Sequence, residues 1–196
     1  MPRPLCPLVA FVLLCASAVA AVAAGLPNPG FEEGLSGWVA KDTMSQVLPE
    51  AARSGKAGLR ITDNDTAKGS DLTSAKIPVT PGQALTLGFY AKAQGDFAAV
   101  YLRFQDAAGG FVKDEARKYT GGMPAAGVKK GAGAWTPYTL KATVPEGAAT
   151  VAVWIHSWAG ATGTADFDDF ELAGVAADAR PVIGAQSAVA APTAAV

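Results

Sequence analysis

Three side chains capable of specific contacts stand at every second position of one short segment. They are Trp154, His156 and Trp158. The alternate positions carry the β-branched residues Val151, Val153 and Ile155. A period of two is typical of a β-strand with one buried face, because successive side chains of a strand point to opposite sides. The pattern therefore predicts that the two tryptophans and the histidine lie on the face away from the core.

Two other segments show the same alternation. It predicts that Leu85, Leu87 and Phe89 are buried and that Tyr90 points outward. In the next segment it predicts Leu102 and Phe104 inside, with Tyr101, Arg103 and Gln105 outside. If these strands share one sheet, its outer surface collects Tyr90, Tyr101, Arg103, Gln105, Trp154, His156 and Trp158. Such a surface suits sugars, since aromatic rings cover their C–H faces and the polar side chains bond their hydroxyls.

Catalysis finds little support in the residue types. The chain has one histidine and two cysteines, and no Gly-x-Ser-x-Gly segment, so neither a familiar nucleophile elbow nor a multi-histidine metal site is predicted. A glycosidase needs two carboxyl groups facing each other across a cleft, and nothing places such a pair on the aromatic face. We therefore expect a binding protein and not an enzyme.

The elements that would position these residues are all strands. Short alternating runs, separated by Gly, Pro, Asn and Asp, predict strands at 58–62, 75–79, 84–92, 98–105, 136–144, 150–157 and 165–172. No run keeps a helical period, so an all-β fold is predicted, a β-sandwich jelly roll. The glycine-rich segment 107–134 is predicted to be a long loop, either functional or mobile. It is also the segment that would cover the aromatic face if those aromatics are structural.

The two ends of the chain differ in composition from the middle. Residues 1–24 combine Arg3, an apolar run and small residues, which is the pattern of a secretory signal peptide, with an uncleaved membrane anchor as the alternative. Both cysteines, Cys6 and Cys15, fall inside it, so no disulfide is expected. Residues 175–196 are rich in alanine and proline and are predicted to be a disordered tail or linker. The domain is thus predicted at 25–174, in a protein that is secreted or held in the periplasm or cell envelope.

The net charge of −1 offers no electrostatic footprint for nucleic acid or for an anionic membrane. We expect neither as a partner once the signal peptide is removed, and we expect a monomer.

Two end motifs carry a family resemblance. Asn28-Pro29-Gly30-Phe31-Glu32 stands near the start, followed by Gly37-Trp38, and Phe167-Asp168-Asp169-Phe170-Glu171-Leu172 stands near the end. Together they resemble the carbohydrate-binding modules of families 4, 9, 16 and 22, which are galactose-binding-like jelly rolls. The resemblance implies binding of a polysaccharide or oligosaccharide on an aromatic-bearing concave sheet. It also implies buried, structural roles for Trp38 and Trp135.

The same resemblance implies a structural calcium ion where the first strand, the following loop and the last strand meet. Glu32 and Asp168 would supply carboxylates and Lys56 a backbone carbonyl, since calcium prefers oxygen ligands. Alternatively, these carboxylates only cap turns or pair with Arg53, without a metal.

Modules of this kind normally accompany a catalytic domain, and none is recognised in this sequence. We therefore expect a protein that acts alone, or beside a glycan-active enzyme on a separate chain. The rival hypothesis is a structural or protein-interaction module of the cell envelope. Solvent access to Trp154 and Trp158 distinguishes the two.

Overall fold

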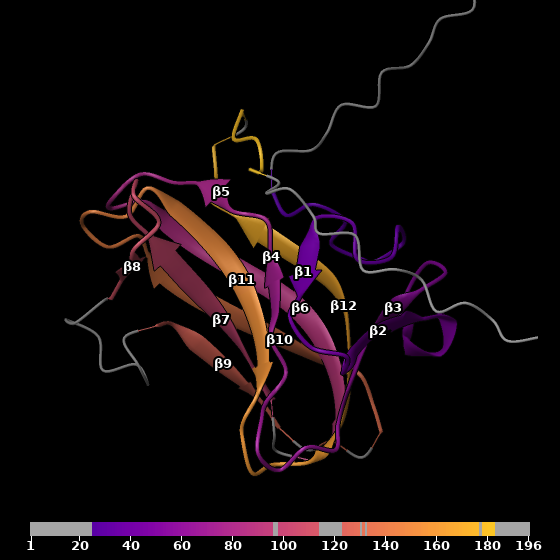
Figure 1. Cartoon of the computed structure of the whole chain (residues 1–196). Helices are drawn as coiled ribbons and strands as arrows, with labels where there is room; N and C mark the ends of the chain where they lie inside the picture. Colours follow the sequence, from indigo (N-terminus) through magenta and orange to yellow (C-terminus); the bar gives the residue numbers. More distant parts are fainter. Residues whose placement is uncertain are drawn as a thin grey trace, which may run out of the picture.

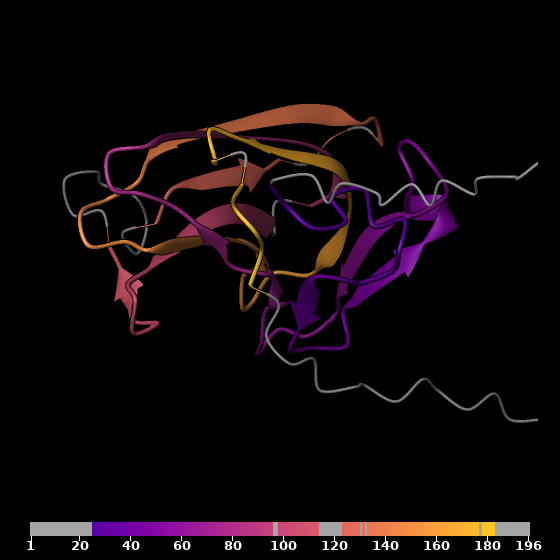
Figure 2. The ribbon, with the colours of Figure 1, turned by 90° about the horizontal axis from the view of Figure 1, so that it is seen from above.

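The computed structural model describes residues 25–95, 98–113, 123–129, 131, 133–176 and 178–182. It consists of two antiparallel sheets packed face to face, so the predicted all-β sandwich is confirmed (Figures 1 and 2). In the described part of the chain, no helix is long and apolar enough to span a membrane.

One sheet has seven strands and the other five. The seven-stranded sheet runs in the order β1 (Trp38–Ala40), β4 (Leu72–Ser74), β11 (Thr150–Ser157), β7 (Ala98–Gln105) and β8 (Phe111–Val112), while β5 (Ile77–Pro78) pairs with β11 and β9 (Ala125–Val128) with β7. The five-stranded sheet runs in the order β10 (Thr136–Thr143), β6 (Ala84–Gln94), β12 (Gly163–Ala173), β3 (Gly58–Asp63) and β2 (Ser45–Leu48). A short 3₁₀ turn, Pro49–Ala51, follows β2.

The core lies between the sheets and follows the alternation of the long strands. Val151, Val153 and Ile155 of β11 have no exposed surface, as predicted. Leu85, Leu87 and Phe89 of β6 face them from the other sheet, all 2% exposed or less. Burying such side chains is the main force that holds the layers together, worth about 1.5–3 kcal/mol for each.

The ends of the domain meet in an aromatic cluster. Phe31, Trp38 and Phe170 pack with ring centroids 5.0–6.0 Å apart, and the Phe170 N–H donates to the Pro29 carbonyl at 3.0 Å. The buried role of Trp38 is therefore confirmed. For Trp135 the prediction is wrong, because this ring is only half-buried and lies 5.0 Å from the Lys92 ammonium.

Two segments differ from their prediction. The long loop at 107–134 contains β8 and β9, which both pair with the same edge of β7 and widen the sheet. The predicted tail begins later than residue 175, because Ala179 is 7% exposed in the core and Val182 donates its N–H to the Lys76 carbonyl at 2.7 Å. The predicted signal peptide with both cysteines, and residues 183–196 of the predicted tail, lie outside the described residues.

Candidate functional site

Sheet membership divides the seven predicted site residues. Strands β7 and β11 are neighbours, so Tyr101, Arg103, Gln105, Trp154 and His156 share the outer face of the seven-stranded sheet. Strand β6 belongs to the five-stranded sheet, which places Tyr90 on the opposite side of the molecule. There the Arg53 guanidinium lies 3.4 Å from the Tyr90 ring centre. The grouping of Tyr90 with the others was wrong, because alternation assigns a side chain to a face but does not assign its strand to a sheet.

Three rings form a continuous ladder on the outer face of the seven-stranded sheet. Trp154 stands directly opposite Tyr101 in the register, and their ring centroids lie 4.8 Å apart. His156 stacks on the other neighbouring position, 4.3 Å from Trp154. Opposed and next-but-one side chains of an antiparallel pair lie on the same face, so the aromatic ladder follows from the strand register.

The Trp154 ring is held by neighbouring side chains and is less accessible than an exposed ring that stacks on a sugar. Its indole N–H donates to Asp71 Oδ1 at 2.9 Å, and the Arg103 guanidinium lies 3.3 Å from the ring centre. His156 Nδ1 is hydrogen-bonded to the Ser70 carbonyl. These contacts leave Trp154 and His156 half-buried.

Trp158 is the open member of the set. It follows the last residue of β11, is 38% exposed, and donates its indole N–H to the Tyr101 hydroxyl at 3.1 Å. The solvent-access criterion therefore separates the two tryptophans: Trp158 is open, and Trp154 is largely used within the fold.

Beside the ladder, on the same face, lies a groove of about 280 Å³. Its walls are formed by Val39, Lys41, Thr73, Ser74, Ala75, Lys76, Arg103, Gln105, Phe111, Ala152 and Val182. Only Arg103 and Gln105 were among the predicted site residues. The groove is open on its apolar side, since Val39, Phe111 and Val182 are 46%, 64% and 56% exposed.

The apolar wall was missed because of where its residues stand. Val39 and Phe111 come from strands of three and two residues, too short to show a period. A weak signal exists for Phe111, which follows a turn where Asp106 Oδ1 accepts N–H bonds from Ala108 and Gly110 at 2.9 and 2.8 Å. Asp followed by glycines is typical of such turns.

Arg103 lies between the groove and the ladder. Its guanidinium rests on Trp154 and lies 5.5 Å from the Phe111 ring centre. Burial lowers the pKa of Arg103, and the nearby Asp71 carboxylate partly offsets this. An arginine remains protonated in any case, so the groove holds a fixed positive charge.

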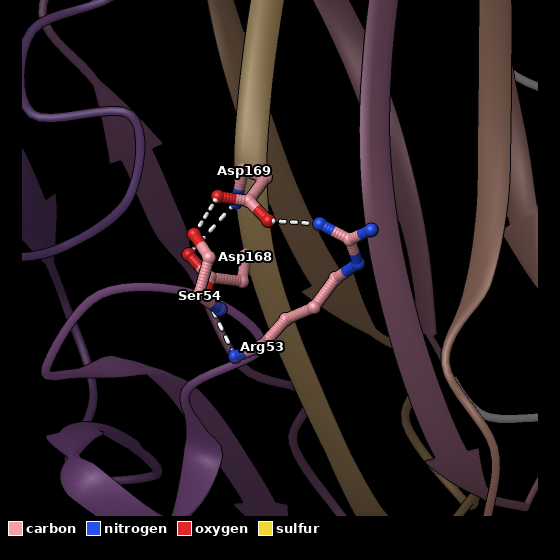
Figure 3. A network of polar contacts seen from close by, with 4 residues as sticks. All are labelled: Arg53, Ser54, Asp168 and Asp169. Atoms are coloured by element: carbon pink, nitrogen blue, oxygen red, sulfur yellow. Dashed lines mark hydrogen bonds and ion pairs between the residues drawn. The ribbon is translucent and has the colours of Figure 1, made fainter.

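At the other end of the domain, Glu32 and Asp168, two of the three predicted calcium ligands, both contact the loop at residues 53–57. Figure 3 shows the Asp168 and Asp169 pair against the loop at Arg53 and Ser54. Asp168 Oδ2 accepts the N–H groups of Arg53 and Ser54 at 2.7 and 3.1 Å, while Asp169 forms the ion pair with Arg53 at 2.6 Å. Glu32 accepts the Lys56 N–H at 3.0 and 2.9 Å. Both carboxylates therefore tie the 53–57 loop to the chain ends.

The donor set fits calcium in part. Asp168 has no exposed surface, burial raises its pKa, and none of the ion pairs among the described residues includes it. Buried carboxylates of this kind are usually paired or bound to a metal. Asp168 and Glu32 also both lie close to Gly30. A Cβ added at Gly30 would lie 3.5 Å from Asp168 Oδ1 and 3.9 Å from Glu32 Cγ.

Lys56 does not fit its predicted role as it stands, because its N–H and not its carbonyl faces Glu32. Within the described residues, no three His, Cys, Asp or Glu side chains converge on one point. An ion between Glu32 and Asp168 would therefore need backbone carbonyls or water as further ligands.

Residues 23–164 match the model of the family described as "Carbohydrate binding domain". No curated protein matches the chain in sequence.

Solved structures share the fold at low sequence identity. The Family 16 Carbohydrate Binding Module-2 superposes with a TM-score of 0.57 and 17% identity, covering 75% of this chain and 97% of that one. The CBM22-1 xylan-binding domain of Xyn10C from Paenibacillus barcinonensis gives 0.54 and 18%, with 78% and 96% covered. The enzymatically active domain of tailspike protein 4 from bacteriophage CBA120 gives 0.61 and 19%, with 79% and 22% covered.

Proposed function

Because the chain belongs to the carbohydrate-binding domain family, we propose that it holds its polysaccharide or oligosaccharide on the outer face of the seven-stranded sheet. The binding face, as we define it, consists of the groove, the half-buried Trp154 and His156 and the exposed Trp158, while Tyr101, only 6% exposed, supports these rings. Phe111 and Trp158 are the exposed rings at its two ends, and Gln105 and Thr73 offer hydrogen bonds between them.

The observation that carries this proposal is the composition of the groove. Exposed apolar side chains alternate with hydrogen-bonding ones, which matches the amphipathic surface of a sugar. Gln105 is already oriented, since its Nε2 donates to the Gly109 carbonyl at 3.1 Å, and its amide oxygen remains available as an acceptor.

The same composition supports a non-catalytic role. Hydrolysis of a glycosidic bond needs two carboxyl groups on either side of it. The groove-lining residues within the described part of the chain include no aspartate or glutamate. We therefore propose binding without turnover, either by the protein alone or in support of an enzyme on another chain.

Export is part of the proposal. The sequence pattern of residues 1–24 supports a cleaved signal peptide, and extracellular or cell-envelope glycans would then be the natural targets. The absence of cysteine after Cys15 means that stability in such a compartment comes from packing and from the junction of the chain ends.

A calcium ion at that junction is the second part of the proposal. Glu32 and Asp168 would hold it, and it would supply a positive charge in direct contact with buried Asp168, which forms no ion pair among the described residues. Its role would be structural, because the junction and the groove lie on different parts of the fold.

Calorimetric titration with a panel of soluble polysaccharides tests the binding face. We expect Phe111→Ala and Trp158→Ala to weaken binding by about 3- to 10-fold each, the equivalent of one aromatic contact. Trp135→Ala is the matched control, because that ring belongs to the other sheet. If no glycan binds, or if the control weakens binding equally, the envelope interaction module becomes the better interpretation.

A further inference from the structure

The groove carries a charge that the chain as a whole does not have. Of the described residues that line it, three are cations, namely Lys41, Lys76 and Arg103, and none is an acid. A smaller hollow of about 120 Å³ adjoins it at Arg103 and Phe111 and adds Lys113, and its described lining residues include no acid either. The formal net charge of the protein is −1, so this local excess is not a consequence of a generally basic surface.

Arg103 is held in a defined orientation, with its hydrogen-bonding edge left available. Its flat guanidinium lies over Trp154 at 3.3 Å and near Phe111 at 5.5 Å. None of the hydrogen bonds or ion pairs between described residues involves the Arg103 side chain. An arginine fixed by stacking is preorganised for a planar, two-oxygen acceptor, because its N–H groups form a rigid fork.

The neighbouring acid does not neutralise this charge. Asp71 already accepts the Trp154 N–H at 2.9 Å, and it lies 3.9 Å from the exposed Lys41 ammonium. One carboxylate therefore stands beside two cations at this end of the groove. Lys76 lies at the other end of the groove, close to Gly109. A Cβ added at Gly109 would lie 3.8 Å from Lys76 Nζ.

We propose that the groove selects polysaccharides that carry uronate carboxylates. The proposal rests on the sugar-binding function above and names its substrate class. One uronate carboxylate would pair with the Arg103 fork, while Lys41 and Lys76 would attract carboxylates of neighbouring residues. Val39, Phe111 and Val182 would pack against the C–H faces of the same sugars. A neutral glycan would leave Asp71 as the one carboxylate that the described residues place beside Lys41 and Arg103.

A pair of matched ligands tests the proposal. Polygalacturonate and alginate are each compared by calorimetry with their carboxyl-reduced forms, which keep the linkage and lose the charge. We expect at least one polyuronate to bind roughly ten- to 100-fold more tightly than its reduced form, as charge-assisted hydrogen bonds would provide. This preference should shrink with added salt, since the cations are partly exposed.

Variants assign the preference to the groove. Arg103→Gln should remove most of the preference for a polyuronate over its reduced form. Arg103→Lys should retain only part of this preference, because an ammonium cannot bind a carboxylate with two parallel bonds. Lys76→Gln should reduce it without disturbing the packing on Trp154. Lys141→Gln is the control, since it removes one positive charge from an exposed position of β10 in the other sheet.

The outcomes separate the two proposals. Equal or tighter binding of the reduced glycans would overturn the uronate preference and leave sugar binding intact. Preference for a sulfated galactan over both polyuronates would also overturn it, in favour of a different anion. Absence of binding to every glycan, charged or neutral, would reject the sugar-binding function itself.

Discussion

At the scale of single residues, Trp154 and Trp158 illustrate how neighbours decide what a side chain can do. Both were predicted from the same alternation, yet their surroundings differ. Trp154 is covered by Arg103 and tied to Asp71, whereas Trp158 is 38% exposed and makes one hydrogen bond. Identical residue types on one face therefore have different roles, one mainly structural and one open to a ligand.

This difference leads to a stability prediction. Trp154→Ala should lower the free energy of unfolding by about 2–3 kcal/mol, somewhat less than for a fully buried tryptophan, because a large half-buried ring and its hydrogen bond are lost. Trp158→Ala should cost less than about 1 kcal/mol. Urea denaturation of both variants measures the two values. Equal losses would mean that Trp154 does not support the sheet in the way its contacts indicate.

Residue-level prediction from sequence had a clear limit here. Alternation identified Tyr101, Arg103, Gln105, Trp154 and His156 on one face, because each lies in an eight-residue strand. It could not identify Val39 or Val182, since each depends on a short pairing that only the tertiary structure creates.

At the scale of elements, the long strands were predictable and their partners were not. The bounds of β7 and β11 agree with the sequence pattern to the residue, because their apolar faces are continuous. The assignment of β6 to the other sheet is a matter of long-range pairing, which no local period encodes. For this reason Tyr90 lies on the far side of the sandwich and not in the predicted site.

The loop between the 3₁₀ turn Pro49–Ala51 and β3 provides a test at this scale. Gly55 has a φ of +64°, and a Cβ there would lie 2.0 Å from Glu32 Oε1. Gly147 has a φ of +81° with nothing within 4 Å of its Cβ position. Gly147→Ala should therefore cost only the left-handed backbone strain, about 1–2 kcal/mol, and Gly55→Ala should cost more, because it also displaces Glu32.

Thermal unfolding of the two glycine variants measures this difference. If Gly55→Ala is no more destabilising than Gly147→Ala, the contact between Glu32 and the 53–57 loop contributes nothing to stability. The junction would then rest on the aromatic cluster and Asp168 alone.

At the scale of the whole molecule, the binding face and the junction of the chain ends have different roles, since the first would hold the ligand and the second closes the sandwich. The two end motifs of the sequence lie far apart in the chain and adjacent in the structure, where Phe31 and Phe170 pack at 6.0 Å. The end motifs therefore encode closure of the sandwich. None of the described residues that line the groove belongs to the end motifs, although Val39 directly follows one, which is why family resemblance at the ends predicted the fold more completely than the site.

The calcium proposal is tested at the same scale, because an ion at the junction would stabilise the domain as a unit. Calcium at about 100 times its dissociation constant adds about 2.7 kcal/mol to a folded state that alone binds it. In a chain of this size that corresponds to roughly 5–10 °C in Tm. We therefore expect a chelator to lower the Tm by that amount, while glycan affinity measured below the transition stays the same.

Glu32→Gln separates calcium from the hydrogen bonds seen at the junction. The amide oxygen of glutamine can still accept one N–H bond from Lys56, but the variant loses a carboxylate ligand and most of its calcium affinity. Its Tm should accordingly resemble that of the chelated protein and should no longer respond to chelator. A wild-type Tm that is indifferent to chelator would reject the calcium site, and the N–H bonds to Glu32 and Asp168 would then be the whole tie between the chain ends.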